Sequence, residues 1–314
     1  MIRLRDIPKM NYTLNKVYER VTEKLRPTPI NEPFTAVGIE VTTYCNSHCD
    51  FCSHETTIGK FRPMGHMPLD MAERSMNYLK RVDGGRILKF SPVGLGETLM
   101  YPHLPEVMRM AKDKFPEAQT FANTNCISLR GKVAEDLIDA DMDVIVFSMC
   151  FVGEKDYQRR LHTNYYGQVS ENIKNFLKMK GDRRPSVKIH VFNLPENKRL
   201  MWKWVAKWSP LLNDNDHLSV YPYVELVNTE ENRNPDNFPC PEIKNYGSVM
   251  IDLQGNLTPC CSALWKQNYD GLIMGHVDDG HPELVGGRLD AFRKNPPCDT
   301  CRRCAILQDG GLRR

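Results

Sequence analysis

The chain has 314 residues and a formal net charge of +3, so its overall charge gives no electrostatic case for a nucleic-acid partner. Hydrophobic residues make up 41% and charged residues 26% of the chain, which is ordinary for a soluble globular protein of one or two domains. No run of about 18 apolar residues is present, so we expect no membrane span. A charged N-terminus without an apolar stretch behind it predicts no signal peptide, and we therefore expect a cytoplasmic protein.

Residues 1–35 precede the first expected strand and form an N-terminal extension in our interpretation. Residues 14–25 can make one amphipathic helix. The segment that follows is expected to be extended, because Pro27, Pro29 and Pro33 restrict the backbone. We interpret the extension as a packing appendage, with a partner-binding arm as the alternative.

From residue 36 to about residue 225, apolar strand-like runs alternate with helical patterns. The expected strands are 36–42, 86–91, 118–123, 143–149, 186–192 and 218–224. The expected helices are 69–82, 103–114, 129–140, 168–180 and 198–208. This alternation predicts a parallel sheet with right-handed crossovers, whose functional groups lie at the C-terminal ends of the strands. Residues 228–241 are rich in Asn, Glu and Pro, which is typical of a linker.

The 11 cysteines fall mostly into two groups, and clustered thiols in a chain without a secretion signal indicate metal binding more than disulfides. The first group, Cys45, Cys49 and Cys52, has the spacing C-x3-C-x2-C and directly follows the first expected strand. Three thiolates this close can hold three irons of a [4Fe–4S] cluster and leave the fourth iron open. Zinc is the weaker alternative, since structural zinc sites usually have four closed ligands. The second group comprises Cys240, Cys260, Cys261, Cys298, Cys301 and Cys304.

The first cysteine loop, with aromatic Phe51 before its last cysteine, resembles that of the radical S-adenosylmethionine (radical SAM) superfamily. Three later strand ends are also similar to that family: the GLGE segment, the Asn123-Thr124-Asn125 end and Ser148. The resemblance implies that the cofactor is bound by Gly94, Gly96, Glu97, Asn123, Ser148 and Arg160. In that set Gly96 and Glu97 would meet the methionine amino group, Ser148 the ribose, and Arg160 or its neighbour Arg159 the carboxylate.

The resemblance covers about residues 36–225 and implies a partial (β/α)6 barrel. It also implies a mechanism in which the open iron binds S-adenosylmethionine and one electron cleaves the sulfonium carbon–sulfur bond. The resulting 5′-deoxyadenosyl radical then removes a hydrogen atom from the substrate, while the protein supplies positioning and shielding from water. The implied partners are a small-molecule or peptide substrate and a flavodoxin- or ferredoxin-type electron donor, with no membrane or nucleic acid.

The second cysteine group resembles the twitch and SPASM extensions of this superfamily, which carry auxiliary [4Fe–4S] clusters. Spacing alone would also allow a zinc ribbon. The resemblance implies a single auxiliary cluster held by Cys240, Cys260, Cys298 and Cys301. Cys261 and Cys304 compete with their neighbours as ligands, and a free thiol among them could instead donate a hydrogen atom. Residues 249–255 resemble the short hairpin of those extensions.

We therefore divide the chain into an extension at 1–35, a radical SAM partial barrel at 36–227 and an auxiliary-cluster domain at 228–314. The C-terminal order resembles that of 2-deoxy-scyllo-inosamine dehydrogenases, which implies a two-electron oxidation of a sugar- or aminocyclitol-like molecule. The alternative is a peptide-modifying enzyme, which often carries a peptide-binding domain larger than 35 residues. A binding protein with a decayed active site is a third possibility, against which the intact cysteine loop argues.

Several other residues carry structural predictions. Cys126 and Cys150 are expected to be buried small residues, because free cysteine is commonly interior. Trp202, Trp204 and Trp208 are expected to pack against the sheet.

Overall fold

The computed structural model describes residues 36–82, 87–194, 198–223, 248–265 and 270–280. The expectations for the N-terminal extension, the linker at 228–241 and four cysteines of the second group lie outside the described residues. Those cysteines are Cys240, Cys298, Cys301 and Cys304. No helix within the described ranges is both long and apolar enough to cross a membrane.

Six parallel strands follow one another in sequence order across the sheet, which confirms the predicted α/β architecture. β1 does not pair with β6, so the sheet is an open partial barrel. These strands are β1 (Ala36–Ile39), β2 (Lys89–Ser91), β3 (Gln119–Thr124), β4 (Val144–Cys150), β5 (Ser186–Asn193) and β6 (His217–Pro222). Each is the apolar run that the sequence indicated, with bounds moved by a few residues.

The free edge of β1 is covered by a strand from the C-terminal segment. β7 (Ser248–Ile251) pairs parallel with β1, and β8 (Asn256–Thr258) and β9 (Gly275–His276) continue antiparallel, giving nine strands in the described part of the sheet. The predicted hairpin is therefore present as β7 and β8. Its pairing with β1 was not predicted. At Gly38 of β1, the end of the Met250 side chain from β7 fills the space that a Cβ would occupy.

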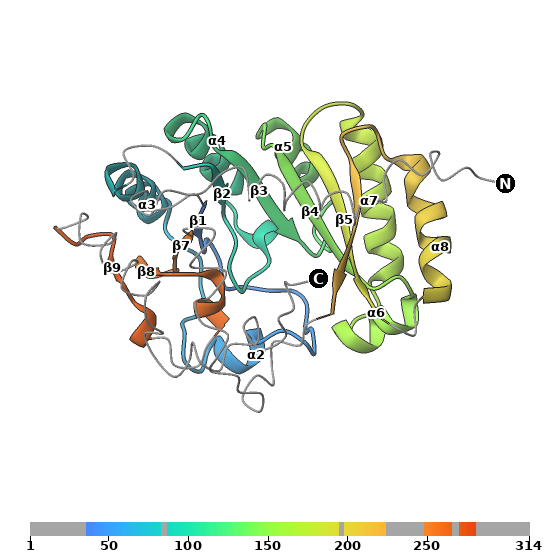
Figure 1. Cartoon of the computed structure of the whole chain (residues 1–314), viewed down its shortest axis with the longest axis horizontal. Coiled ribbons are helices and arrows are strands. Elements are labelled where there is room, and N and C mark those ends of the chain that lie inside the picture. Colours follow the sequence, from blue (N-terminus) through green and yellow to red (C-terminus); the bar gives the residue numbers. More distant parts are fainter. Residues whose placement is uncertain (1–35, 83–86, 195–197, 224–247, 266–269, 281–314) are drawn as a thin grey trace, which may run out of the picture.

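The helices in the described ranges are α2 (His54–Thr57), α3 (Leu69–Val82), α4 (Leu104–Lys114), α5 (Lys132–Asp139), α6 (Glu154–Leu161), α7 (Tyr166–Lys180) and α8 (Lys198–Trp208). Figure 1 shows α3, α4, α7 and α8 on the outer side of the sheet, whereas the short helix α2 lies away from it. α3 and α8 have the predicted bounds. α5 starts three residues later than expected, after Gly131 with a φ of 53°. The helix α6 was not predicted.

Two of the three tryptophans of α8 pack as expected, and one does not. Trp204 and Trp208 are buried, whereas Trp202 is 64% exposed. Residues four apart share a helix face, but a residue two positions away points to the opposite side. The prediction for Trp202 was therefore wrong.

Most outward-facing side chains of the strands are apolar and buried, whereas the inner face carries polar as well as apolar side chains, because successive side chains point to opposite sides of a sheet. On β4, Phe147 faces outward and its ring lies 5.3 Å from that of Phe176 on α7. The next residue, Ser148, faces inward and is only partly buried. On β3, Ala122 is buried in the outer core and Asn123 is exposed on the inner face. Functional groups of the sheet therefore gather on its inner face.

Candidate cofactor site at the C-terminal ends of the strands

The three cysteines of the first group lie in the loop that follows β1, as the sequence predicted. Cys45, Cys49 and Cys52 are free thiols, each partly buried. The loop is fixed by local hydrogen bonds: Cys52 N donates to Cys49 O at 3.1 Å, and Ser47 Oγ lies 3.3 Å from Cys49 Sγ. The sulfur atoms are thus held by a short, ordered stretch of backbone.

Burial raises the pKa of the Cys45 and Cys49 thiols to about 12 and also raises the pKa of Cys52. Thiols in this environment keep their protons until a cation replaces them, as metal binding does. No three His, Cys, Asp or Glu side chains in the described ranges converge on a single ion. Three cysteines in one short loop suit an iron–sulfur cluster, which is held by thiolates, better than a structural zinc ion, which usually has four closed ligands.

The Gly94–Glu97 segment after β2 runs directly against the start of the cysteine loop. The amide of Glu97 donates to Tyr44 O at 2.8 Å. A Cβ on Gly96 would lie 2.8 Å from the same oxygen and closer still to Thr42 O. Only glycine permits this approach, because both obstacles are backbone atoms that cannot rotate away.

The Glu97 side chain is buried, and it holds the ends of two strands together. Its Oε1 accepts from Leu99 N at 3.0 Å and its Oε2 accepts from Asn125 N at 2.7 Å. Burial is the largest influence on this carboxyl and raises its pKa. Both oxygens already serve main-chain amides, so contact of this carboxylate with a methionine amino group remains a prediction.

The end of β3 also reaches the cysteine loop, through a chain of side-chain amides. Asn125 Nδ2 donates to Asn46 Oδ1 at 2.7 Å, and Asn46 Nδ2 donates to Ser128 Oγ at 3.1 Å. Asn46 lies next to Cys45, so β3 helps to position the loop. Asn123 and Ser148 occupy inner-face positions on neighbouring strands.

The structure separates the two arginines that the sequence left as alternatives. Arg160 on α6 donates through Nη1 to Tyr223 Oη at 2.9 Å and lies 3.6 Å from Asp50 Oδ2 in the cysteine loop. Its carbonyl oxygen also accepts from Asp50 N at 2.9 Å. The side chain of Arg159 is 63% exposed and pairs with Asp156. Of the two, Arg160 is the one that lies at the site.

Two site residues were missed from the sequence. Glu40 follows β1 and is fully buried against Gly94, where it forms an ion pair with buried Arg62. A charged residue inside the apolar run Ala36-Val-Gly-Ile-Glu40-Val was a signal that something had to neutralise it. Its partner, 22 residues away, carried no such signal.

The second cysteine group is described only in part. Cys260 is buried and Cys261 is partly buried, at the start of a short 3-10 helix, Cys261–Trp265. Both follow β8, whose partner β7 lies beside β1. The described part of the C-terminal segment is therefore joined to the strand that precedes the first cysteine loop.

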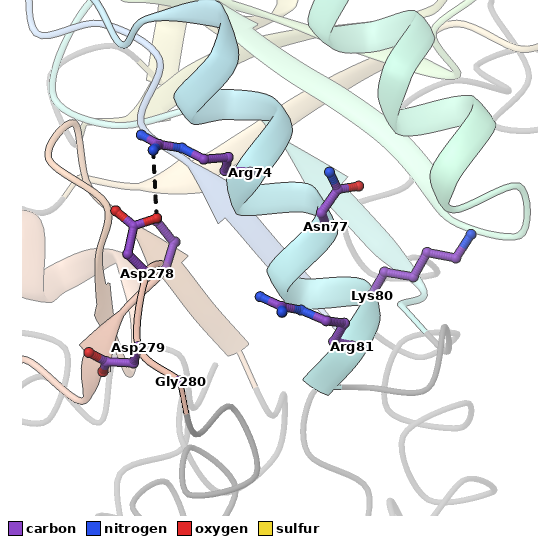
Figure 2. A pocket seen from close by; sticks show the side chains of 8 residues that line it. Arg74, Asn77, Lys80, Arg81, Asp278, Asp279 and Gly280 are labelled. Atoms are coloured by element: carbon purple, nitrogen blue, oxygen red, sulfur yellow. Dashed lines mark ion pairs between the residues drawn. The ribbon is translucent and has the colours of Figure 1, made fainter.

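A separate cavity of about 740 Å³ lies outside this site, between α3 and the segment after β9 (Figure 2). Arg74 and Asp278 approach each other across it at 3.7 Å. Positive and negative side chains both line it, and none of its lining residues belongs to the predicted cofactor set.

Comparison with solved structures shows the same fold in several enzymes. BtrN, a 2-deoxy-scyllo-inosamine dehydrogenase solved with AdoMet and 2-DOIA, is 18% identical, with 88% of this chain and 91% of BtrN covered at a TM-score of 0.51. SuiB of Streptococcus suis, bound to its precursor peptide SuiA, is 14% identical, with 95% and 76% covered at 0.56. The enzyme anSMEcpe, with AdoMet and a peptide, is 13% identical, with 86% and 87% covered at 0.58.

A curated relative and a family model match the sequence itself. GTP 3′,8-cyclase of Chlorobaculum tepidum is 27% identical over 145 residues, which are 45% of this chain and 40% of the relative. The chain thus spans about two fifths of that enzyme's length. The model of the radical SAM superfamily matches residues 39–205, more than half of the chain and including the cysteine loop. The chain therefore belongs to the radical SAM superfamily, whose enzymes use a [4Fe–4S] cluster and S-adenosylmethionine.

Proposed function

We propose that this enzyme oxidises a small hydroxylated molecule, of the sugar or aminocyclitol kind, by two electrons. Cys45, Cys49 and Cys52 hold the cluster in this proposal. When bound, the cluster and S-adenosylmethionine supply a carbon-centred radical that removes a hydrogen atom from the substrate. The chain's own residues hold these groups, orient the substrate and keep water away.

The glycine segment, the inner-face polar residues and Arg160 form the proposed S-adenosylmethionine site. Gly94 and Gly96 let this segment pack closely against Glu40 and the start of the cysteine loop. Asn123 and Ser148 present polar atoms on adjacent strands. Arg160, already placed at the cysteine loop, provides a cation for the ligand's carboxylate. Glu97 positions the segments that follow β2 and β3, because its carboxylate accepts hydrogen bonds from Leu99 N and Asn125 N.

The auxiliary cluster is the second part of the proposal, and it supplies the acceptor for the second electron. Cys260 is its described candidate ligand, with Cys240, Cys298 and Cys301 as the remaining three. Supporting this assignment, β7 and β8 join the segment around Cys260 to β1. A cluster held in part by Cys260 would lie in the segment that follows β8, which β7 joins to the strand before the first cysteine loop. The division of the chain into an extension at 1–35, a partial barrel at 36–227 and an auxiliary-cluster domain at 228–314 belongs to this proposal.

The observation that carries the substrate class is a pair of polar side chains on the inner face that the proposed cofactor site does not use. Partly buried His190 on β5 lies in register with partly buried Ser219 on β6. Uncharged hydrogen-bonding groups of this kind match hydroxyl groups better than phosphates or long apolar chains. The match to BtrN also supports this class, since BtrN is a 2-deoxy-scyllo-inosamine dehydrogenase and the chain covers 91% of its length.

The test is an anaerobic assay with 2-deoxy-scyllo-inosamine deuterated at its carbinol carbon. We expect deuterium in 5′-deoxyadenosine and a ketone as product. Formation of 5′-deoxyadenosine without deuterium would reject this substrate class while leaving the radical chemistry intact. Absence of 5′-deoxyadenosine with dithionite and S-adenosylmethionine would reject the whole proposal.

Peptide modification is the second candidate function. It is favoured by the shared fold with SuiB and anSMEcpe, both solved with peptides. In this case the same assay would show no deuterium transfer from the aminocyclitol. Peptides encoded by neighbouring genes would instead gain a crosslink, detected by mass spectrometry as the loss of two hydrogens, or an inverted centre, detected by chiral amino-acid analysis after hydrolysis.

A further inference from the structure

The inner face of β5 carries a histidine at the level of the proposed cofactor site. Val187, Ile189 and Val191 point outward into the core, so His190 points to the opposite, inner side. His190 is paired in register with Ser148 of β4 and with Ser219 of β6. Three hydrogen-bonding side chains therefore stand side by side across three strands.

The Nε2 atom of His190 is buried and makes no hydrogen bond to any residue that the structure describes. Leaving a buried polar atom unpaired costs about 1–3 kcal/mol, so native proteins usually provide a partner. The surrounding side chains are aromatic: the Tyr221 ring lies 4.4 Å and the Phe192 ring 5.0 Å from the imidazole, centroid to centroid. Burial lowers the pKa of His190 to about 4, which keeps the ring neutral at physiological pH.

Aromatic contacts connect this histidine to the cysteine loop. Phe192, which touches His190, lies 5.4 Å from the ring of Phe51, centroid to centroid. Phe51 is the residue before Cys52. A molecule bound at His190 would therefore sit along the wall that leads to the proposed cluster.

We propose that Nε2 of His190 forms a hydrogen bond with a hydroxyl group of the substrate and selects for that hydroxyl. This inference rests on the proposed function, which it makes more specific. A neutral imidazole offers either a lone pair or an N–H at Nε2, and a hydroxyl can satisfy both because it donates and accepts. A neutral ring gives no preference for a phosphate or carboxylate.

The ribose of S-adenosylmethionine also carries hydroxyls, and the experiment separates the two sources. Reconstituted enzyme is titrated anaerobically with S-adenosylmethionine alone, and then with 2-deoxy-scyllo-inosamine in the presence of S-adenosylmethionine. His190→Phe removes the polar atom and keeps a ring, and His190→Asn restores a donor and an acceptor. His217→Phe, on β6 nearer the start of the strands, is the matched control.

We expect His190→Phe to bind S-adenosylmethionine like the wild type and the aminocyclitol about 10-fold to 100-fold more weakly, with partial recovery in His190→Asn. His217→Phe should change neither affinity. Weaker binding of S-adenosylmethionine by His190→Phe would overturn the inference and assign His190 to the ribose. Unchanged aminocyclitol affinity in a variant with wild-type iron content would also overturn it. If the wild type itself does not bind the aminocyclitol, the proposed substrate class fails first, and the inference with it.

Discussion

Glu40 and Arg62 form an ion pair in the interior of the protein, with side chains 0% and 1% exposed. Glu40 Oε1 accepts from Leu95 N at 3.0 Å in the glycine segment, and its Oε2 accepts from Leu253 N at 3.3 Å in the β7–β8 turn. Arg62 Nη1 donates to Leu264 O at 2.9 Å, three residues after Cys261. One buried charge pair therefore joins the proposed S-adenosylmethionine site to the segment that carries the second cysteine group.

Breaking this pair should destabilise the enzyme strongly. Arg62→Met leaves a buried carboxylate without its cation, which costs about 3–5 kcal/mol. Adding Glu40→Gln removes that charge and keeps an acceptor for Leu95 N, so the double variant should recover part of the loss. The measurement is the free energy of unfolding from anaerobic urea titrations. Arg74→Met, which breaks an exposed pair with Asp278, is the control and should change it by less than about 1 kcal/mol. Equal effects of the two arginine substitutions would contradict this role.

Gly96→Ala should disrupt the contact between the glycine segment and the cysteine loop. The new Cβ meets backbone oxygens of Thr42 and Tyr44, so the loop itself must move. Overpacking of this kind costs about 1–3 kcal/mol. If S-adenosylmethionine binding requires the close approach to be restored, this cost weakens the affinity by about 5-fold to 150-fold. The control is Gly167→Ala, where a Cβ meets nothing within 4 Å. Equal affinities of the two variants would show that the close approach is not needed for binding.

The two adjacent arginines should respond differently to removal. Arg160→Leu loses the contacts with Tyr223 and Asp50 and a cation for the ligand's carboxylate, so S-adenosylmethionine should bind about 10-fold to 100-fold more weakly. Arg159→Leu removes a mostly exposed side chain and should leave the affinity unchanged. Both are measured by titration of reconstituted enzyme with matched iron content. A larger effect at Arg159 would reverse the assignment.

Asp143 should make stability depend on acid pH, at the end of the sheet away from the site. Burial alone would raise its pKa, but hydrogen bonds from Lys112 and Thr120 outweigh it and lower the pKa. A carboxyl with a lowered folded-state pKa stabilises the protein above its unfolded pKa of about 4, and this contribution disappears as pH falls through the lower folded value. The unfolding free energies of wild type and Asp143→Asn should therefore differ at pH 7 and converge below about pH 4. A constant difference across this range would contradict the assignment.

The sequence predicted what depends on local pattern. α3 and α8 were placed correctly because their periodicity is strong, and the cysteine loop was placed at a strand end because an apolar run precedes it. The pairing of β7 with β1 was not predictable, since a strand of four residues carries no mark of a partner more than 200 positions away. The two main-chain amides that donate to Glu97 were not predictable either, since no local pattern marks them, and its contact with the methionine amino group stays a prediction. The role of Arg62 is visible only in the three-dimensional structure, where its guanidinium forms an ion pair with Glu40.

The most direct test of the central claim combines iron analysis with electron paramagnetic resonance of the anaerobically reconstituted enzyme. The variant Cys45→Ala/Cys49→Ala/Cys52→Ala is compared with the wild type, with and without S-adenosylmethionine. We predict about eight irons in the wild type and about four in the variant. The wild-type spectrum should change when S-adenosylmethionine is added, and the variant's should not. A variant that keeps the wild-type iron content and the response to S-adenosylmethionine would contradict the account.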